Sequence, residues 1–182
     1  MKNELVQKIK WLSANSKYLI KRDILVEELA ELLEATNSPR LYISKWTNES
    51  IIEEFADVYT MLSQIVVYLG ENTVAEYIEN YEDKESMKAS VETMSFMQKA
   101  THTIWVVSKI RREQDVINNF KEFRAVIYLL CEALESQLEH LREIKQNDVL
   151  DKIYDMIEFK VNRQVKRQEE ELYGSYADKE SK

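Results

Sequence analysis

The sequence contains very few of the residues that interrupt helices or cross-link chains. Among its 182 residues are 2 glycines, 1 proline and 1 cysteine. Two glycines cannot supply the turns of a many-stranded β fold or a glycine-rich phosphate loop. One cysteine excludes an intramolecular disulfide framework. The first expectation is therefore an all-α protein whose helices are joined by short polar connections.

Histidine is also scarce, and the charge is one-sided. The chain has 2 His, and 25 Lys+Arg stand against 33 Asp+Glu, for a formal net charge of −8. Carboxylates would therefore have to carry most of any catalysis. The negative charge argues against nucleic-acid binding, although a small anion carried in with metal ions is not excluded.

Long apolar segments are missing as well. No apolar run approaches the roughly 18 residues that a membrane span needs, and no secretory segment follows Met1. We therefore expect a cytoplasmic protein that has no contact with a membrane. An apolar fraction of 45% is nevertheless high enough for a real core.

Short polar segments divide the chain into helices within a single all-α domain, 1–182. The main breaks fall near Pro39, Gly70, Glu82 and Asn147. The tail 174–182 is expected to fray. The predicted helices cover residues 3–14, 18–36, 49–69, 73–81, 87–113, 116–145 and 148–172.

Two neighbouring helices each carry a pair of carboxylates three residues apart. The pairs are Glu28 with Glu31 and Glu54 with Asp57. This spacing places both members of a pair within about 60° of each other on the helix surface. Glu28 lies at the edge of an apolar arc, and Glu54 lies close to the middle of an apolar face. We therefore expect the carboxylates to point inward.

Carboxylates that point inward need cations. Their burial without compensation is costly, and neighbouring carboxylates repel each other. Hard divalent ions such as Mg²⁺ take oxygen ligands and are commonly shared between carboxylates and substrate phosphates. The alternative is that these carboxylates form ordinary salt bridges on solvated helix faces. This is disfavoured because two matching pairs on adjacent helices would rarely arise by accident. A di-iron centre would need Glu-x-x-His, but His102 follows Lys99 and His140 follows Gln137 at that spacing.

This pattern resembles the signature of a known family. Glu28-x-x-Glu31, followed after 22 residues by Glu54-x-x-Asp57, is similar to the motif of the all-α NTP pyrophosphatase superfamily. The superfamily includes MazG-like proteins, dCTP pyrophosphatases and dimeric dUTPases. Three flanking segments are also similar to MazG-like helices: VEELAELLEA at 26–35, IIEEFADVYTMLSQI at 51–65 and EFKVNRQVKRQEEE at 158–171.

The resemblance implies an antiparallel helical bundle of MazG-like type and an enzymatic activity. That activity is Mg²⁺-dependent hydrolysis of a nucleoside triphosphate to a monophosphate and pyrophosphate by metal-activated water, and Mn²⁺ could replace Mg²⁺. It further implies that the metal ligands are Glu28, Glu31, Glu54 and Asp57. The rival hypothesis is a catalytically inactive scaffold or interaction protein that retains a metal-binding acidic cluster.

Other residues are candidates for catalysis and substrate binding. Glu27 and Glu53 would support the metal ligands or orient the attacking water, and they form the catalytic part of the prediction. Lys45 and Trp46 are similar to a loop of the dCTP pyrophosphatases and would contact phosphate and base, although a tryptophan in a small helical protein is more often core.

The last predicted helix carries a row of cations. Lys160, Arg163 and Arg167 share one helix face and continue an apolar stripe, so they could reach phosphates in a neighbouring cleft. The alternative is that they are placed to favour the helix C-terminus and to pair with Glu169 to Glu171.

Residues 82–147 have no counterpart in short MazG-like proteins, whose catalytic core would correspond here to 1–81 plus 148–172. Residues 121–130 agree with 53–62 at four positions, which suggests a decayed second repeat. The alternatives are an inserted helical hairpin and chance agreement between amphipathic helices. It therefore stays open whether one chain completes the site. In the family a partner subunit usually completes it, which would make this protein a homodimer. The base and the sugar of the substrate are not specified.

Overall fold

The computed structural model describes residues 2–15, 17–36, 49–87 and 93–180. Side chains at 18–20, 113–114 and 172–180 are not part of the description. The described residues form helices and turns without any β-strand, so the all-α prediction is confirmed. The principal helices are α1 (Asn3–Asn15), α2 (Tyr18–Ala35), α3 (Glu49–Tyr68), α4 (Val74–Asn80), α6 (Phe96–Lys109), α7 (Glu113–Asn118), α8 (Phe120–Glu143) and α9 (Asn147–Glu180).

The predicted helix at 87–113 is longer than the structure allows. Helix α6 begins only after Ser95, whose hydroxyl accepts from the Gln98 backbone N–H at 3.3 Å while the Gln98 side chain accepts from the Ser95 N–H at 2.8 Å. This reciprocal capping box fixes the start of the helix. At the other end of the chain, α9 continues past Gly174 to Glu180, so most of the tail predicted to fray has helical backbone.

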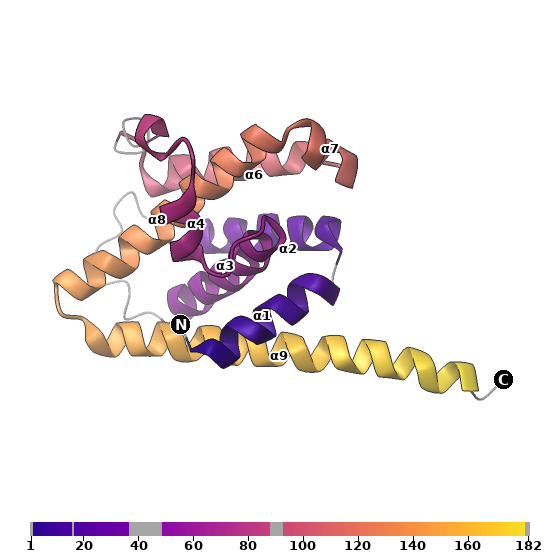
Figure 1. The fold of residues 1–182 in the computed structure, drawn as a ribbon. Helices are drawn as coiled ribbons and strands as arrows, with labels where there is room; N and C mark the ends of the chain where they lie inside the picture. Colours follow the sequence, from indigo (N-terminus) through magenta and orange to yellow (C-terminus); the bar gives the residue numbers. More distant parts are fainter. Residues whose placement is uncertain (1, 16, 37–48, 88–92, 181–182) are drawn as a thin grey trace.

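Helices α2 and α3 form an antiparallel pair at the centre of the molecule (Figure 1). Helices α1 and α9 pack on one side of this pair, and α9 extends well beyond the body towards the C-terminus (Figure 1). A second pair, α6 with α8, lies on the other side, where α6 contacts α2 and α4 packs against α8. A decayed repeat and an inserted hairpin would both produce such a second pair.

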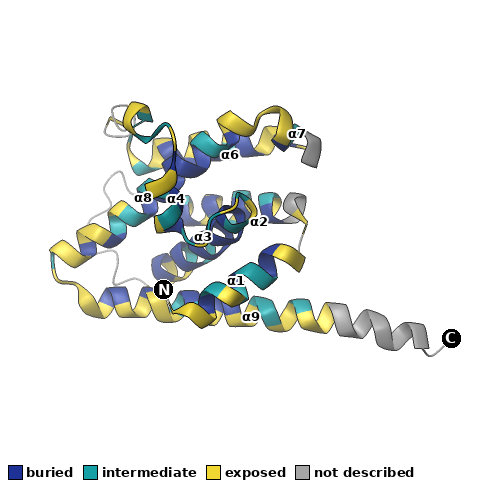
Figure 2. Cartoon of the chain, viewed as in Figure 1, coloured by how far each residue is buried: buried dark blue, intermediate teal, exposed yellow. Residues whose placement is uncertain are grey.

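Helix α3 supplies much of the core because it is surrounded by α1, α2 and α9. Its residues are buried almost continuously from Phe55 to Val66, with the exception of Asp57, and much of α3 has the dark blue of buried residues in Figure 2. On α2, Leu25, Leu29 and Leu32 recur at helical spacing and are buried in the same core. Within the described parts of the chain, no helix is both long and apolar enough to cross a membrane.

Candidate functional site

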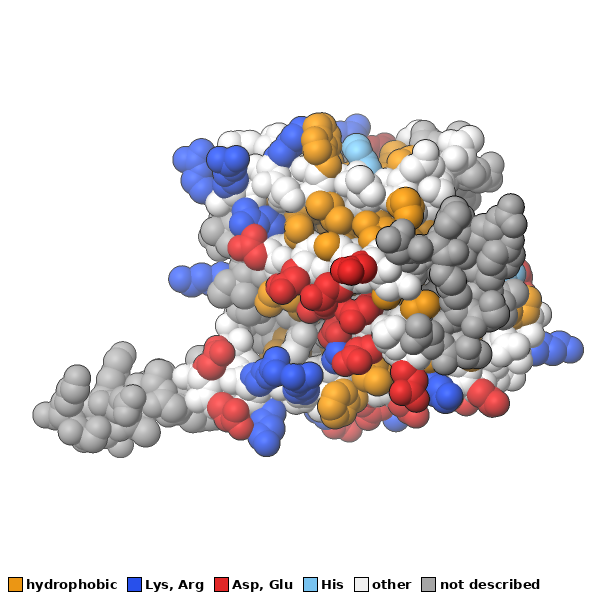
Figure 3. Space-filling view, turned by 180° about the vertical axis from the view of Figure 1, so that it is seen from behind, with side chains coloured by type: hydrophobic (Ala, Val, Ile, Leu, Met, Phe, Trp, Pro, Cys, Tyr) orange, Lys and Arg blue, Asp and Glu red, His pale blue; other side chains and the backbone are white. Residues whose placement is uncertain are grey.

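A cleft of about 810 Å³ lies between α2, α3, α9 and the end of α1. Carboxylates dominate one end of it, and the face shown in Figure 3 carries a band of acidic side chains with Lys and Arg side chains beside it. The side chains that line the cleft are Leu12, Asn15, Lys17, Lys21, Ile24, Glu27, Glu28, Glu31, Glu53, Glu54, Asp57, Met61, Gln64, Lys160, Arg163, Gln164, Arg167, Gln168 and Glu171.

Three of the four predicted metal ligands come together at the acidic end. Glu28 from α2 and Glu54 and Asp57 from α3 each offer a carboxylate oxygen, and these oxygens lie within 4.8 Å of one another. All three side chains are half-buried. Their positions follow from helical phase, because each directly precedes a buried core residue, namely Leu29, Phe55 and Val58.

The electrostatics of this acidic triad, Glu28, Glu54 and Asp57, favour the uptake of positive charge. Burial, followed by the charges of Asp57, Glu31 and Glu54, raises the pKa of Glu28 to about 7. Burial and the neighbouring carboxylates also raise the pKa of Glu54. The pKa of Asp57 is raised by burial, although its hydrogen bond to Lys160 opposes the shift. Like charges held at this distance are stabilised by protons or by cations.

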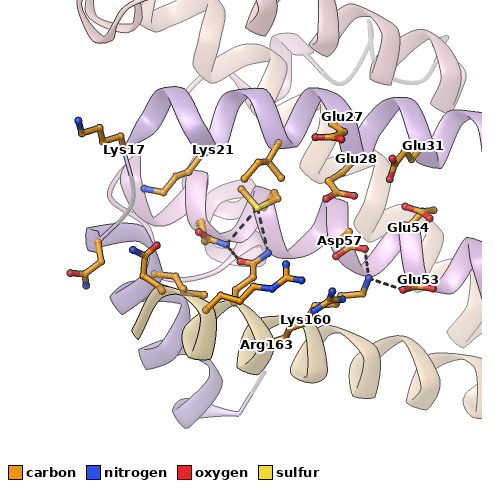
Figure 4. Close-up of a pocket in the computed structure, with 18 of the residues that line it drawn as sticks. Lys17, Lys21, Glu27, Glu28, Glu31, Glu53, Glu54, Asp57, Lys160 and Arg163 are labelled. Atoms are coloured by element: carbon orange, nitrogen blue, oxygen red, sulfur yellow. Dashed lines mark hydrogen bonds and ion pairs between the residues drawn. The ribbon is translucent and has the colours of Figure 1, made fainter. Parts of the chain in front are cut away.

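Glu31 and Glu27 lie at the rim of the same end. Glu31 is exposed and is not part of the acidic triad, but its carboxylate is close enough to Glu54 to raise the pKa of Glu54 (Figure 4). Glu27 is exposed and lines the cleft on the α2 side. The fourth predicted ligand is therefore adjacent to the other three rather than among them.

Lys160 is a buried cation beside the acidic end of the cleft. Its side chain is only 8% exposed, and its Nζ donates to Glu53 Oε1 at 3.0 Å and also to Asp57 (Figure 4). Burial alone would lower the pKa of Lys160, but these hydrogen bonds and charges together raise it. Glu53, predicted from sequence as a catalytic residue, is thus tied to α9 through Lys160.

Of the remaining predicted substrate-binding residues, two line the cleft and two lie outside the described residues. Arg163 and Arg167 follow Lys160 along α9, are exposed, and line the cleft as expected. Arg163 is also near enough to Asp57 for its charge to oppose, in small part, the rise in the pKa of that carboxyl that burial causes. Lys45 and Trp46 lie outside the described residues.

Sequence reasoning missed the polar groups at the other end of the cleft. Gln64 from α3 and Gln164 from α9 hydrogen-bond to each other at 2.7 Å, and Lys21 is buried nearby. A signal was present in the spacing, because Gln64 is seven residues beyond Asp57, two turns along the same face of α3. Similarly, Gln164 is one turn beyond Lys160 on α9.

The acidic end suits a hard divalent cation. Its donors are carboxylate oxygens rather than imidazole nitrogens or thiolates, and they carry an excess of negative charge in a half-buried setting. Such a donor set is typical of Mg²⁺ and Mn²⁺ sites and atypical of Zn²⁺ sites. The cations of α9 beside it provide partners for phosphate groups.

Comparisons with known proteins give no match: no family model matches the chain, and neither does any curated protein or solved structure. The resemblance to MazG-like proteins therefore stays a prediction from the acidic motif and its flanking segments.

Proposed function

We propose that this protein is a Mg²⁺-dependent nucleoside triphosphate pyrophosphohydrolase that releases a nucleoside monophosphate and pyrophosphate. The observation that carries the proposal is the convergence of Glu28, Glu54 and Asp57 within 4.8 Å at one end of a cleft that also presents the cations of α9. Carboxylates and cations side by side suit a substrate that brings both divalent metal and polyphosphate charge.

The acidic triad would hold the divalent cation, with Glu31 able to join from the rim. When bound, the cation would screen the polyphosphate charge and lower the pKa of a water molecule. Arg163 and Arg167 are exposed on the cleft side of α9, where their guanidinium groups can donate paired hydrogen bonds to phosphate oxygens.

Glu53 is the residue best placed to orient the attacking water. Lys160 engages its Oε1 at 3.0 Å and thereby fixes the carboxylate at the edge of the acidic triad. The side chain is 50% exposed, so Oε2 can accept a hydrogen bond from a water in the cleft. Glu27, exposed on the opposite wall, is the second candidate for this role.

The direct test is a pyrophosphate-release assay with a panel of NTPs and dNTPs in the presence of Mg²⁺ or Mn²⁺. We expect metal-dependent release that is lost in Glu54→Gln. Glu122→Gln is the matched control, because Glu122 occupies the position in α8 that aligns with Glu54 and is exposed. A folded wild-type protein that releases no pyrophosphate from any member of the panel would refute the proposal and favour an inactive scaffold.

A further inference from the structure

The cleft is larger than a metal site requires, and its two ends differ in chemistry. Lys17 and Lys21 lie at the end remote from Glu31 and Glu54 (Figure 4). On α3, the distance along the helix from Asp57 to Gln64 is about 10 Å. An elongated ligand whose charged groups sit among the carboxylates and α9 cations would therefore extend its other end towards Gln64.

Two carboxamides from different helices meet at this point. Gln64 of α3 is 3% exposed, and its Nε2 donates to Gln164 Oε1 of α9 at 2.7 Å. Within the described part of the chain, the Gln164 amide nitrogen donates only to the Met61 sulfur at 3.7 Å, which is a weak acceptor. The Gln164 NH₂ group can therefore donate a hydrogen bond to a stronger acceptor on a ligand.

The backbone beneath the pair is held in place. Ser13 of α1 donates its hydroxyl to the Gln64 carbonyl at 2.8 Å, and the buried Lys21 donates to the Ser13 carbonyl at 2.5 Å. A contact from α1 thus fixes the position of Gln64, and a hydrogen bond from α3 fixes that of Gln164. Binding groups fixed before a ligand arrives lose little entropy when they bind it.

Apolar side chains also line the cleft. Leu12, Ile24 and Met61 contribute to it from α1, α2 and α3, and the Met61 sulfur contacts both amides. Apolar side chains together with a few fixed polar groups are typical of small-molecule sites. A carboxamide can pair with the adjacent donor and acceptor on the edge of a nucleobase.

We infer that Gln64 and Gln164 form the base-reading subsite of this cleft and determine which nucleobase the protein accepts. The inference rests on the proposed function, because it assumes a nucleotide whose phosphates occupy the acidic end. In this arrangement Gln64 orients Gln164, and the Gln164 amide contacts the edge of the base.

The test compares kcat/KM for four NTPs that differ only in the base, using wild type and Gln164→Met. The methionine keeps the length of the side chain and removes the amide. We expect the ratio between the best and worst base to fall by about tenfold, mainly through KM, with Mn²⁺ binding unchanged. Gln137→Met on α8, outside the cleft, is the matched control and should leave the ratio unaltered.

A second variant separates base reading from a structural role. Gln164→Glu keeps the acceptor for Gln64 and exchanges the NH₂ donor for an acceptor, so the rank order of the bases should shift towards those that present a donor. A purely structural role would weaken all four bases alike. Unchanged base ratios in both Gln164 variants would overturn the inference while leaving the proposed activity intact.

Binding without turnover distinguishes failure of the inference from failure of the proposed function. If wild type releases no pyrophosphate, calorimetric titration with AMP, GMP, CMP and UMP in chelator tests the amide pair directly. Binding of one base that weakens about tenfold in Gln164→Met supports the subsite. Binding of none of the four, or binding that the substitution leaves unaltered, contradicts it.

Discussion

The helical pairs α2–α3 and α6–α8 use carboxylates in opposite ways. On α8, Glu135 accepts a hydrogen bond from the hydroxyl of Tyr59 at 2.7 Å, and Glu132 accepts one from Tyr128 at 3.2 Å. Burial and the neighbouring Glu135 raise the pKa of Tyr59 far enough to keep it a proton donor. Between α2 and α3, by contrast, carboxylates face other carboxylates. The carboxylates of α8 thus have tyrosine hydroxyls as donors, whereas Glu28, Glu54 and Asp57 lie together in a group that could hold a metal ion, with Lys160 donating to Asp57.

The aligned segments 53–62 of α3 and 121–130 of α8 show which positions the two helices share and which they do not. Phe55 and Phe123 are both buried, as are the aligned pairs Val58 with Val126 and Leu62 with Leu130. The apolar positions thus agree, while Asp57 aligns with Ala125. Core packing is common to the two helices, whereas of the two only α3 contributes carboxylates to the described lining of the cleft.

The largest expected effect is on activity. Asp57→Asn removes one charge from the acidic triad and weakens the partner of Lys160, so metal-dependent pyrophosphate release should fall by about 100-fold or more. Glu132→Gln on α8 should leave the rate within about twofold, because Glu132 lies outside the cleft. Equal losses of pyrophosphate release in Asp57→Asn and Glu132→Gln would show that the carboxylates of the two helical pairs do not differ in function.

The next effect concerns Lys160. Lys160→Met leaves Asp57 and Glu53 without their cation, so the metal-free protein should lose about 2 kcal/mol of stability, measured by chemical denaturation. Millimolar Mg²⁺ should then raise the Tm of this variant more than that of wild type. Lys166→Met on the exposed part of α9 is the control, since Lys166 is 78% exposed and its ion pair is with Glu170 on the same helix, at 3.9 Å. If the Tm shift caused by Mg²⁺ were the same in wild type and Lys160→Met, the Lys160 ammonium and the metal ion would not neutralise the same carboxylates.

Matched Glu→Gln substitutions in the two pairs should change stability with opposite signs. Glu28→Gln relieves repulsion in the acidic triad and should raise the Tm of the metal-free protein by roughly 2–4 °C, on the order of 1 kcal/mol after solvent screening. Glu135→Gln weakens the charge-assisted hydrogen bond from Tyr59 and should lower the Tm by a similar or smaller amount. Thermal melts in chelator measure both, and a destabilising Glu28→Gln would contradict the electrostatic account.

The smallest effect is a dependence on pH. Because the folded state raises the pKa of Glu28 from 4.5 to about 7, it favours the protonated carboxyl. The resulting stabilisation is complete below pH 4.5 and is lost as the pH rises towards 7. In chelator, the stability advantage of Glu28→Gln over wild type should therefore grow between pH 5 and pH 8. A constant difference across that range would show that Glu28 titrates normally.

Polar segments and helical phase made much of the fold and part of the site predictable from sequence. The polar segments between helices gave α1, α2 and α3 to within a residue or so, and apolar spacing placed Glu28 and Glu54 towards the core. The start of α6 was predicted wrongly at residue 87, directly after the polar segment near Glu82. The capping box at Ser95 instead starts the helix at Phe96.

The remainder of the site depends on how distant helices pack. Which member of each i, i+3 pair faces the partner helix is set by the way α2 and α3 cross, so Glu31 could not be assigned to the rim in advance. The contacts of Lys160 with Asp57 and of Gln164 with Gln64 join residues 100 or more positions apart. Local spacing shows which face such residues occupy but not which residue lies opposite.

Direct measurement of divalent-cation binding tests whether the acidic triad is a metal site. Mn²⁺ would be titrated calorimetrically into wild type, Glu54→Gln and Glu122→Gln without nucleotide. We expect wild type and Glu122→Gln to bind Mn²⁺ equally, and Glu54→Gln to bind it at least about tenfold more weakly. Equal Mn²⁺ affinity in all three proteins would contradict the assignment of Glu28, Glu54 and Asp57 as a metal site.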